Sequence, residues 1–282
     1  MTKGYLMLAQ NNSVDDYVLQ ACVCAMSILA HNPNSKISLV TNDAVDAIYL
    51  ELFDNIIPIP WTDSAADTEW KVKNRWKLYH VTPYDETIVL DTDMLILENI
   101  DHWWNFLSRY ELYFPTSVYT YRKTKIVDTY YRKAFVSNNL PNIYVGFHYF
   151  KKCDRVHEFY KWVEDISNNW ELFYGQYCKT NYPKRMSMDI TCSIAVKIMN
   201  CENEITNKVV KNPTFVHMKP YIQDWKDIKT RWQDKVGTYL TPNLKLMIGN
   251  HLQSGVFHYT ENDFITDEIV EIYKNYIGLS NE

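Results

Sequence analysis

The sequence is poor in glycine and has no closely spaced cysteine pairs of the metal-binding kind. Seven of its 282 residues are glycine, and no G-x-G-x-x-G or G-x-x-x-x-G-K-S/T string occurs. These absences exclude the Rossmann dinucleotide-binding and P-loop fingerprints. The six cysteines form no C-x-x-C pair or metal-finger spacing, and a chain of this length, 46% of it apolar, needs no disulfide staples. We therefore expect free, buried thiols in a reducing compartment.

An excess of positive charge and a long apolar run are also missing. The net charge of −5 argues against binding of nucleic acid through the overall field and leaves only a local basic patch. The most apolar helix-length stretch, residues 17–30, is shorter than the roughly 20 residues that a bilayer requires. The N-terminus is too polar for a secretory signal. We expect a soluble, cytoplasmic protein without membrane contact, from a bacterium or a virus-infected cell. The oligomeric state stays open.

Strand and helix patterns alternate over roughly the first hundred residues. This alternation predicts an open α/β sheet with right-handed crossovers. Later patterns predict a strand at 143–150, helices at 156–166 and 189–199, and a short strand ending at 217. We expect one domain over residues 1–220 and an irregular helical extension, 221–282, packed on it. The expected early strands are 3–9, 36–41, 56–59 and 87–90, and the expected early helices are 14–30, 45–53 and 72–80.

An acidic triplet, Asp91-Thr92-Asp93, follows a continuous apolar strand. Ligands of open α/β sheets bind beyond the carboxyl ends of the strands, so the triplet, residues 9–12 and residues 42–43 should share one rim. Two carboxylates one residue apart on a fixed backbone can share a divalent cation, which would neutralise a diphosphate. The alternative for such a pair is a turn or a helix cap.

Two short motifs precede this triplet in the sequence, and the order of the three is informative. Lys77-Leu78, Tyr84-Asp85 and Asp91-Thr92-Asp93 resemble the helix, turn and D-x-D triplet of the GT-A nucleotide-sugar glycosyltransferases, and among them glycosyltransferase family 8, the glycogenin-like group. The resemblance implies a GT-A-like mixed sheet flanked by helices. It also implies Mn²⁺ or Mg²⁺ on Asp91 and Asp93, a uridine diphosphate (UDP) sugar as donor, Lys77 near that donor, and retention of anomeric configuration.

Further positions carry roles that the resemblance implies. His217 would complete the metal shell and Lys219 would contact phosphate, although their spacing is shorter than the family's. Asp189 would reach the sugar and stabilise developing positive charge. The alternatives are a packed core histidine for His217, a solvated helix face for Lys77 and a helix N-cap for Asp189. His251 and His258 are interpreted as packing residues rather than a zinc pair. The residues expected to hold the nucleotide, besides Lys77 and Lys219, are Ala9, Gln10, Asn11, Asn12, Tyr17 and Thr92.

A basic and aromatic segment, residues 119–135, is the candidate acceptor surface. Basic side chains with interleaved rings can hold extruded or single-stranded bases. The alternative is a solvated amphipathic helix whose tyrosines pack inward. If the segment is functional, a hydroxymethylated base in phage DNA is one acceptor and a glycan is another. The residues that we single out are Tyr121, Arg122, Lys123, Lys125 and Arg132.

The sequence thus predicts metal-dependent transfer of a sugar from a nucleotide donor to a hydroxyl group. The acceptor is open between DNA, a glycan and a protein. A nucleotidyltransferase would use the same paired carboxylates but would release pyrophosphate. A non-catalytic module that binds nucleic acid or glycan would turn over no donor.

Overall fold

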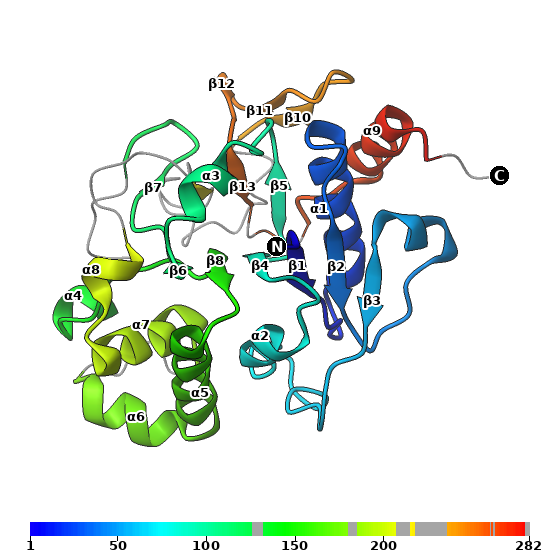
Figure 1. Ribbon diagram of the computed structural model, residues 1–282. Coiled ribbons are helices and arrows are strands. Elements are labelled where there is room, and N and C mark those ends of the chain that lie inside the picture. The colour runs from blue at the N-terminus through cyan, green and yellow to red at the C-terminus, as the bar shows by residue number, and fades with distance from the viewer. Residues whose placement is uncertain are drawn as a thin grey trace.

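The computed structural model describes residues 1–125, 132–179, 185–206, 215–217, 236–259, 261 and 263–279. Within these residues, a six-stranded sheet has the order β3-β2-β1-β4-β8-β6 (Figure 1). Its first four strands are parallel, and β8 runs antiparallel between β4 and β6. The predicted mixed α/β sheet is confirmed. The strands are β1 (Lys3–Leu8), β2 (Ile37–Val40), β3 (Asn55–Ile57), β4 (Glu86–Leu90), β6 (Leu112–Tyr113) and β8 (Phe147–Lys151).

Apolar layers cover both faces of this sheet. Alternate residues of a strand point to opposite faces, so Tyr5 and Met7 join one buried cluster while Leu6 and Leu8 join another. The first cluster contains α1 (Tyr17–His31) and α9 (Asp267–Ile277), and the second contains α5 (Asp154–Asn168) and α7 (Met188–Met199). Strands buried on both faces explain the continuous apolar runs in the sequence.

A second sheet brings strands from the C-terminal part of the chain close to the end of β4. It has the order β5-β13-β9-β7, in which β13 is antiparallel to β5 and parallel to β9. A three-stranded antiparallel sheet, β10-β11-β12, precedes β13 in the chain. None of these strands from the extension was predicted. The bounds are β5 (Met94–Ile96), β7 (Val118–Tyr119), β9 (Phe215–His217), β10 (Thr238–Leu240), β11 (Leu246–Ile248), β12 (His251–Leu252) and β13 (Val256–His258).

Short helices fill the connections. In the described ranges, no helix has both the length and the apolar character needed to cross a bilayer. All six cysteines are free, as predicted, and Cys153 alone of the six is partly exposed. The remaining helices are η1 (Ala47–Leu52), η2 (Arg75–Lys77), α2 (Leu78–Val81), α3 (Trp103–Leu107), α4 (Lys133–Ser137), α6 (Trp170–Tyr177) and α8 (Glu202–Ile205).

Two predicted elements begin later than expected. In each, side chains hydrogen-bond to backbone N–H groups of the first residues that we assigned to the element. The Asn12 carboxamide oxygen accepts from the backbone N–H groups of residues 14 and 15, so α1 begins at Tyr17 with Asp16 as its cap. Asp189 accepts from the backbone N–H of Val145, so β8 begins at Phe147 instead of residue 143. The expected helices at 45–53 and 72–80 are also shorter, and both contain 3₁₀ turns.

Candidate metal centre

Asp91 and Asp93 lie at the carboxyl edge of β4, as predicted. The backbone N–H of Asp91 donates to the carbonyl of Gly146 at 2.8 Å, and the carbonyl of Asp93 accepts from Tyr259 at 3.1 Å. Thr92, between them, is buried. A Cβ on Gly146 would lie 2.9 Å from Asp91 Oδ2, so a glycine is needed for this close approach. Backbone contacts on both sides therefore fix the direction of the two carboxylates.

His258 completes a cluster with these two acids. Pairing of β13 with β5 places His258 opposite Met94, and its Nε2 lies 2.8 Å from Asp93 Oδ2. One ligand atom from each of Asp91, Asp93 and His258 lies within 4.8 Å of the other two. Burial alone would raise the pKa of Asp93, but His258 and Arg75 lower it below the ordinary value. The acid is thus held in its charged, cation-binding form.

His217 was the predicted third ligand. Its backbone in β9 pairs in register with that of His258, but its side chain lies outside the described residues. His217 therefore stays a prediction, as does Lys219, which also lies outside the described residues. The interpretation of His258 as a packing residue does not account for its bond to Asp93. Its partner is 165 residues away, so no local sequence pattern could indicate this contact.

Arg75 is a site residue that the sequence analysis missed. Its guanidinium forms an ion pair with Asp91 Oδ1, and the side chain is 19% exposed. Burial opposes the charged form, but the nearby carboxylates of Asp91, Asp93 and Asp189 raise the pKa of Arg75 above its ordinary value. Arg75 therefore carries a permanent positive charge beside the acids. The sequence signal that could have identified Arg75 is its position, two residues before the Lys77-Leu78 motif.

Lys77 makes contacts within the protein that the sequence analysis did not predict. The side chain is buried, and its ammonium donates to the backbone carbonyls of Pro60, at 3.1 Å, and Thr62. Burial lowers the pKa of Lys77. These bonds tie η2 to the loop after β3. The predicted role of Lys77 toward a donor stays a prediction.

Four of the residues expected to hold the nucleotide, residues 9–12, directly follow β1. Gln10 donates to Asp63 at 2.8 Å and accepts from Asn74 at 2.8 Å, while Asn11 donates its backbone N–H to Asp43. Ala9 is buried, and its backbone N–H donates to β2. These bonds join the end of β1 to the loop at residue 63 and to the residues before η2. Together these segments form one rim.

Tyr17 lies near both this rim and the acids. Its hydroxyl donates to Asp15 at 3.2 Å. Burial and the Asp15 carboxylate raise the pKa of Tyr17 to about 12, with a smaller contribution from Asp93. Asp93 therefore lies within electrostatic reach of the Tyr17 ring, so the predicted nucleotide residue and the acidic cluster share one neighbourhood. Whether the ring contacts a base stays a prediction.

Asp189 and Arg132 form an ion pair beside this neighbourhood, in which Arg132 is buried and Asp189 is partly exposed. Arg132 is 3% exposed and bonds to Asp189, to the side chain of Asn142 and to the carbonyl of Ile143. Asp189 also accepts from the backbone N–H of Val145 at 2.8 Å. Ser187, not Asp189, occupies the N-cap position of α7. Asp189 thus anchors Val145. The next residue, Gly146, accepts the hydrogen bond from the backbone N–H of Asp91.

The predicted acceptor residues separate into two groups. Tyr121 and Arg132 are buried, whereas Arg122, Lys123 and Lys125 are exposed on a tight turn. Lys123 has a positive φ of 62°, and its backbone N–H donates to the Thr120 carbonyl. Residues 126–131 of the segment lie outside the described residues. An exposed basic turn is therefore present, but Arg132 belongs to the interior.

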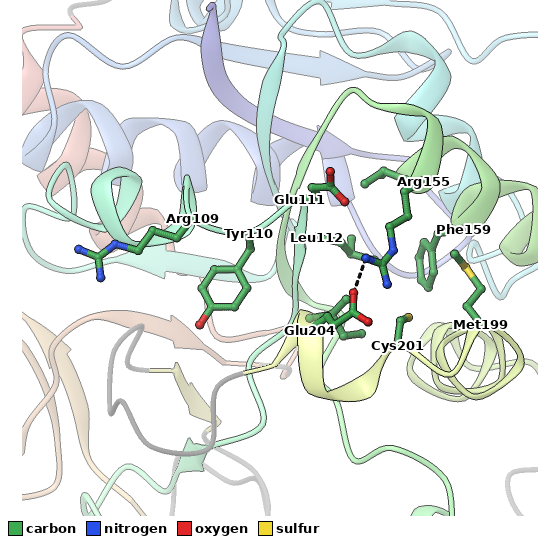
Figure 2. A pocket seen from close by; sticks show the side chains of 11 residues that line it. Arg109, Tyr110, Glu111, Leu112, Arg155, Phe159, Met199, Cys201 and Glu204 are labelled. Atoms are coloured by element: carbon green, nitrogen blue, oxygen red, sulfur yellow. Dashed lines mark ion pairs between the residues drawn. The ribbon is translucent and has the colours of Figure 1, made fainter.

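A cavity of about 190 Å³ is lined by residues of β6, α5 and α8 and of the segments next to them (Figure 2). The backbone carbonyl of Glu111, which lines the cavity, accepts from the backbone N–H of Lys151. Lys151 pairs with Glu86 at the start of β4, whereas Asp91 follows the end of that strand. The cavity is therefore at the opposite edge of the sheet. In Figure 2, Arg155 and Glu204 point toward one another across it and form an ion pair.

No protein-family model and no curated protein matches the sequence. Similar folds occur among solved glycosyltransferases. An active-site mutant of LgtC is 14% identical, with a TM-score of 0.50, and the match covers 98% of this chain and 95% of that one. Mouse xyloside xylosyltransferase 1 is 11% identical, with a TM-score of 0.49 and coverage of 94% and 99%.

The glycosyltransferase GlyE of Streptococcus pneumoniae TIGR4 is a third similar structure. It is 14% identical, with a TM-score of 0.46 over 98% of this chain. This chain spans 60% of the GlyE chain in one structure and 46% in its apo form. The LgtC match establishes the class of fold, which is that of the GT-A glycosyltransferases, as predicted. Membership of family 8 stays a prediction.

Proposed function

We propose that this chain is a metal-dependent glycosyltransferase that moves a sugar from a nucleoside diphosphate sugar to a hydroxyl group. The observation that carries the proposal is the convergence of Asp91, Asp93 and His258 beside Arg75, on a sheet of GT-A type. Two carboxylates and an imidazole are a suitable donor set for Mn²⁺, and the carboxylates also suit Mg²⁺. The donor nucleotide that the sequence resemblance implies is UDP.

The proposed reaction breaks the bond between the anomeric carbon and the diphosphate, so negative charge grows on the leaving group. A bound divalent ion supplies Lewis-acid stabilisation of that charge. Asp91, Asp93 and His258 would hold the ion. Arg75 adds a fixed positive charge next to Asp91, and preorganised charge of this kind lowers the barrier without reorganisation.

Asp189 has a positioning role in this proposal. Its carboxylate fixes Val145, and the adjacent Gly146 carbonyl fixes the backbone of Asp91. A direct role toward the sugar, with retention of configuration, is the expectation from the resemblance. Residues 9–12, Thr92 and Tyr17 would form the nucleotide side, and Lys77 and Lys219 the phosphate side.

A glycan is the acceptor that we favour. Of the residues expected to hold a base, Tyr121 and Arg132 are buried and engaged in internal contacts. The exposed turn of Arg122, Lys123 and Lys125 supports DNA as the second candidate. If DNA is the acceptor, charge reversal of these three residues should impair transfer and spare donor hydrolysis.

The test is mass spectrometry of the products that form with Mn²⁺ and a panel of nucleotide sugars, with glycans or hydroxymethylated DNA. We expect release of a nucleoside diphosphate and its loss in Asp93→Asn, while Asp165→Asn, an exposed acid on α5, behaves as wild type. Undiminished release in Asp93→Asn would reject the site. Nucleotide transfer with release of pyrophosphate would identify a nucleotidyltransferase. Tight ligand binding without any turnover would identify a binding module.

A further inference from the structure

Trp61 is an exposed aromatic residue held in an unusual backbone conformation. It follows Pro60 in the loop between β3 and η2, and 66% of its surface is exposed. Its φ of 57° lies in the left-handed region, which bulky side chains rarely adopt. Exposed apolar surface and strained backbone are both typical of binding sites. Neither feature is used by the proposed metal centre.

A buried platform supports the indole of Trp61. Its ring stacks on that of Trp76 with centroids 5.5 Å apart and planes 14° apart. The ring of His80 meets both indoles edge-on, at 5.4 and 5.7 Å. The buried ammonium of Lys77 binds the backbone carbonyls of Pro60 and Thr62, on either side of Trp61. The loop is thus anchored at both neighbours of Trp61, and the indole lies flat on a fixed base.

The platform shares an element with the metal centre. In η2, Arg75 contacts Asp91, and the next residue, Trp76, lies against Trp61. The metal centre and the indole platform therefore contact neighbouring residues of the same short helix. Residues 61–69 include three carboxylates, those of Asp63, Asp67 and Glu69, and no lysine or arginine. The segment that supports Trp61 carries Lys71, Lys73, Arg75 and Lys77, so the charge around the indole is balanced. The flat apolar face of the indole is therefore the feature that selects a ligand.

We propose that Trp61 is a stacking site for a pyranose ring of a glycan. The C–H face of such a ring is apolar and flat enough to cover an indole, while its hydroxyls stay in water. The choice of a sugar rests on the proposed glycosyltransferase function, in which this ring would belong to the acceptor.

The experiment measures binding without donor or metal, by saturation-transfer NMR and calorimetry. The probes are oligosaccharides of glucose, galactose and N-acetylglucosamine, and a single-stranded oligonucleotide. Trp61→Gly should weaken oligosaccharide binding roughly threefold to tenfold, the equivalent of one lost aromatic contact. Because glycine tolerates φ of 57°, the melting temperature should not fall steeply. Trp61→Phe should keep part of the affinity. Tyr276→Ala, which removes another exposed ring, should keep all of it.

Three results would overturn the proposal. They are equal oligosaccharide affinity in Trp61→Gly and wild type, no oligosaccharide binding by wild type, and Trp61-dependent binding of the oligonucleotide instead. The assay contains neither donor nor metal, so its outcome does not depend on transfer, and Asp165→Asn should bind oligosaccharide as wild type does. Failure of the stacking site and failure of the proposed transfer chemistry are therefore observed separately.

Discussion

The imidazole Nε2 of His258 lies 2.8 Å from the carboxylate Oδ2 of Asp93, although 165 residues separate them in the chain. This contact depends on β13, which brings the C-terminal part of the chain alongside β5, directly after the acidic triplet. The metal centre is therefore assembled from two distant segments, and its integrity depends on the second sheet.

Substitution of His258 by glutamine should weaken Mn²⁺ binding by roughly tenfold or more, because a nitrogen ligand is lost while an amide can still bond to Asp93. Free Mn²⁺ measured by electron paramagnetic resonance during a titration gives the affinity. His217→Gln is the matched comparison. If His217→Gln weakens binding and His258→Gln does not, the third ligand is His217, as the sequence resemblance implies.

Gly146→Ala should disturb the same centre from its other side. The added Cβ would lie 2.8 Å from Met94 Cε and 2.9 Å from Asp91 Oδ2, so one of these groups must move. We expect weaker Mn²⁺ binding and a stability loss of about 1–3 kcal/mol, measured by urea denaturation. Gly175→Ala, on α6, meets nothing within 4 Å and should leave Mn²⁺ affinity unchanged. Equal Mn²⁺ affinity in both variants would contradict this account of Gly146.

Arg132→Met should destabilise the fold by about 1–3 kcal/mol, because it removes the buried guanidinium while Asp189, which is 26% exposed, stays partly solvated. The guanidinium also lies between the rings of Phe135 and Tyr144, at 3.7 and 4.0 Å from their centroids. Arg132→Lys keeps the charge but loses the planar fork, so it should fall between wild type and Arg132→Met. An acceptor role would instead leave stability unchanged and affect transfer alone.

Stability should fall in mild acid because of His148. Its Nδ1 lies 2.8 Å from the Val145 carbonyl and its Nε2 lies 2.9 Å from the Tyr160 hydroxyl, an arrangement that suits the neutral ring. Burial lowers the pKa of His148 from 6.5 to about 4. The unfolded chain therefore binds the proton first as the pH falls. The contribution of the neutral His148 ring to the free energy of unfolding is therefore full above pH 6.5. It decreases as the pH falls toward 4, by about 3 kcal/mol in all.

The check is the difference in unfolding free energy between wild type and His148→Gln as a function of pH. Subtraction removes the carboxylates that titrate in both proteins. A difference that does not change between pH 7 and pH 4 would show that His148 does not titrate as its burial requires.

The extent of prediction from sequence differed between regions of the chain. The strands before Asp91 were predicted because continuous apolar runs bounded by polar residues are a local signal. Residues 143–146 were wrongly assigned to a strand. Arg132 bonds to the carbonyl of Ile143 and Asp189 accepts from the N–H of Val145, so these groups are not available to a neighbouring strand. The strands of the extension were not predicted, because each is two or three residues long and too short for a periodic pattern.

The sequence by itself determined the α/β alternation and the place of Asp91 and Asp93 at the end of a buried strand, because both follow from local periodicity and the geometry of parallel sheets. Only the tertiary structure decided which other groups meet those acids. Arg75 contacts Asp91, His258 contacts Asp93, and Arg132 is buried against Asp189. The physical reason is that such contacts depend on how separate segments pack, and a side chain's partner across the fold leaves no pattern among its neighbours in the chain.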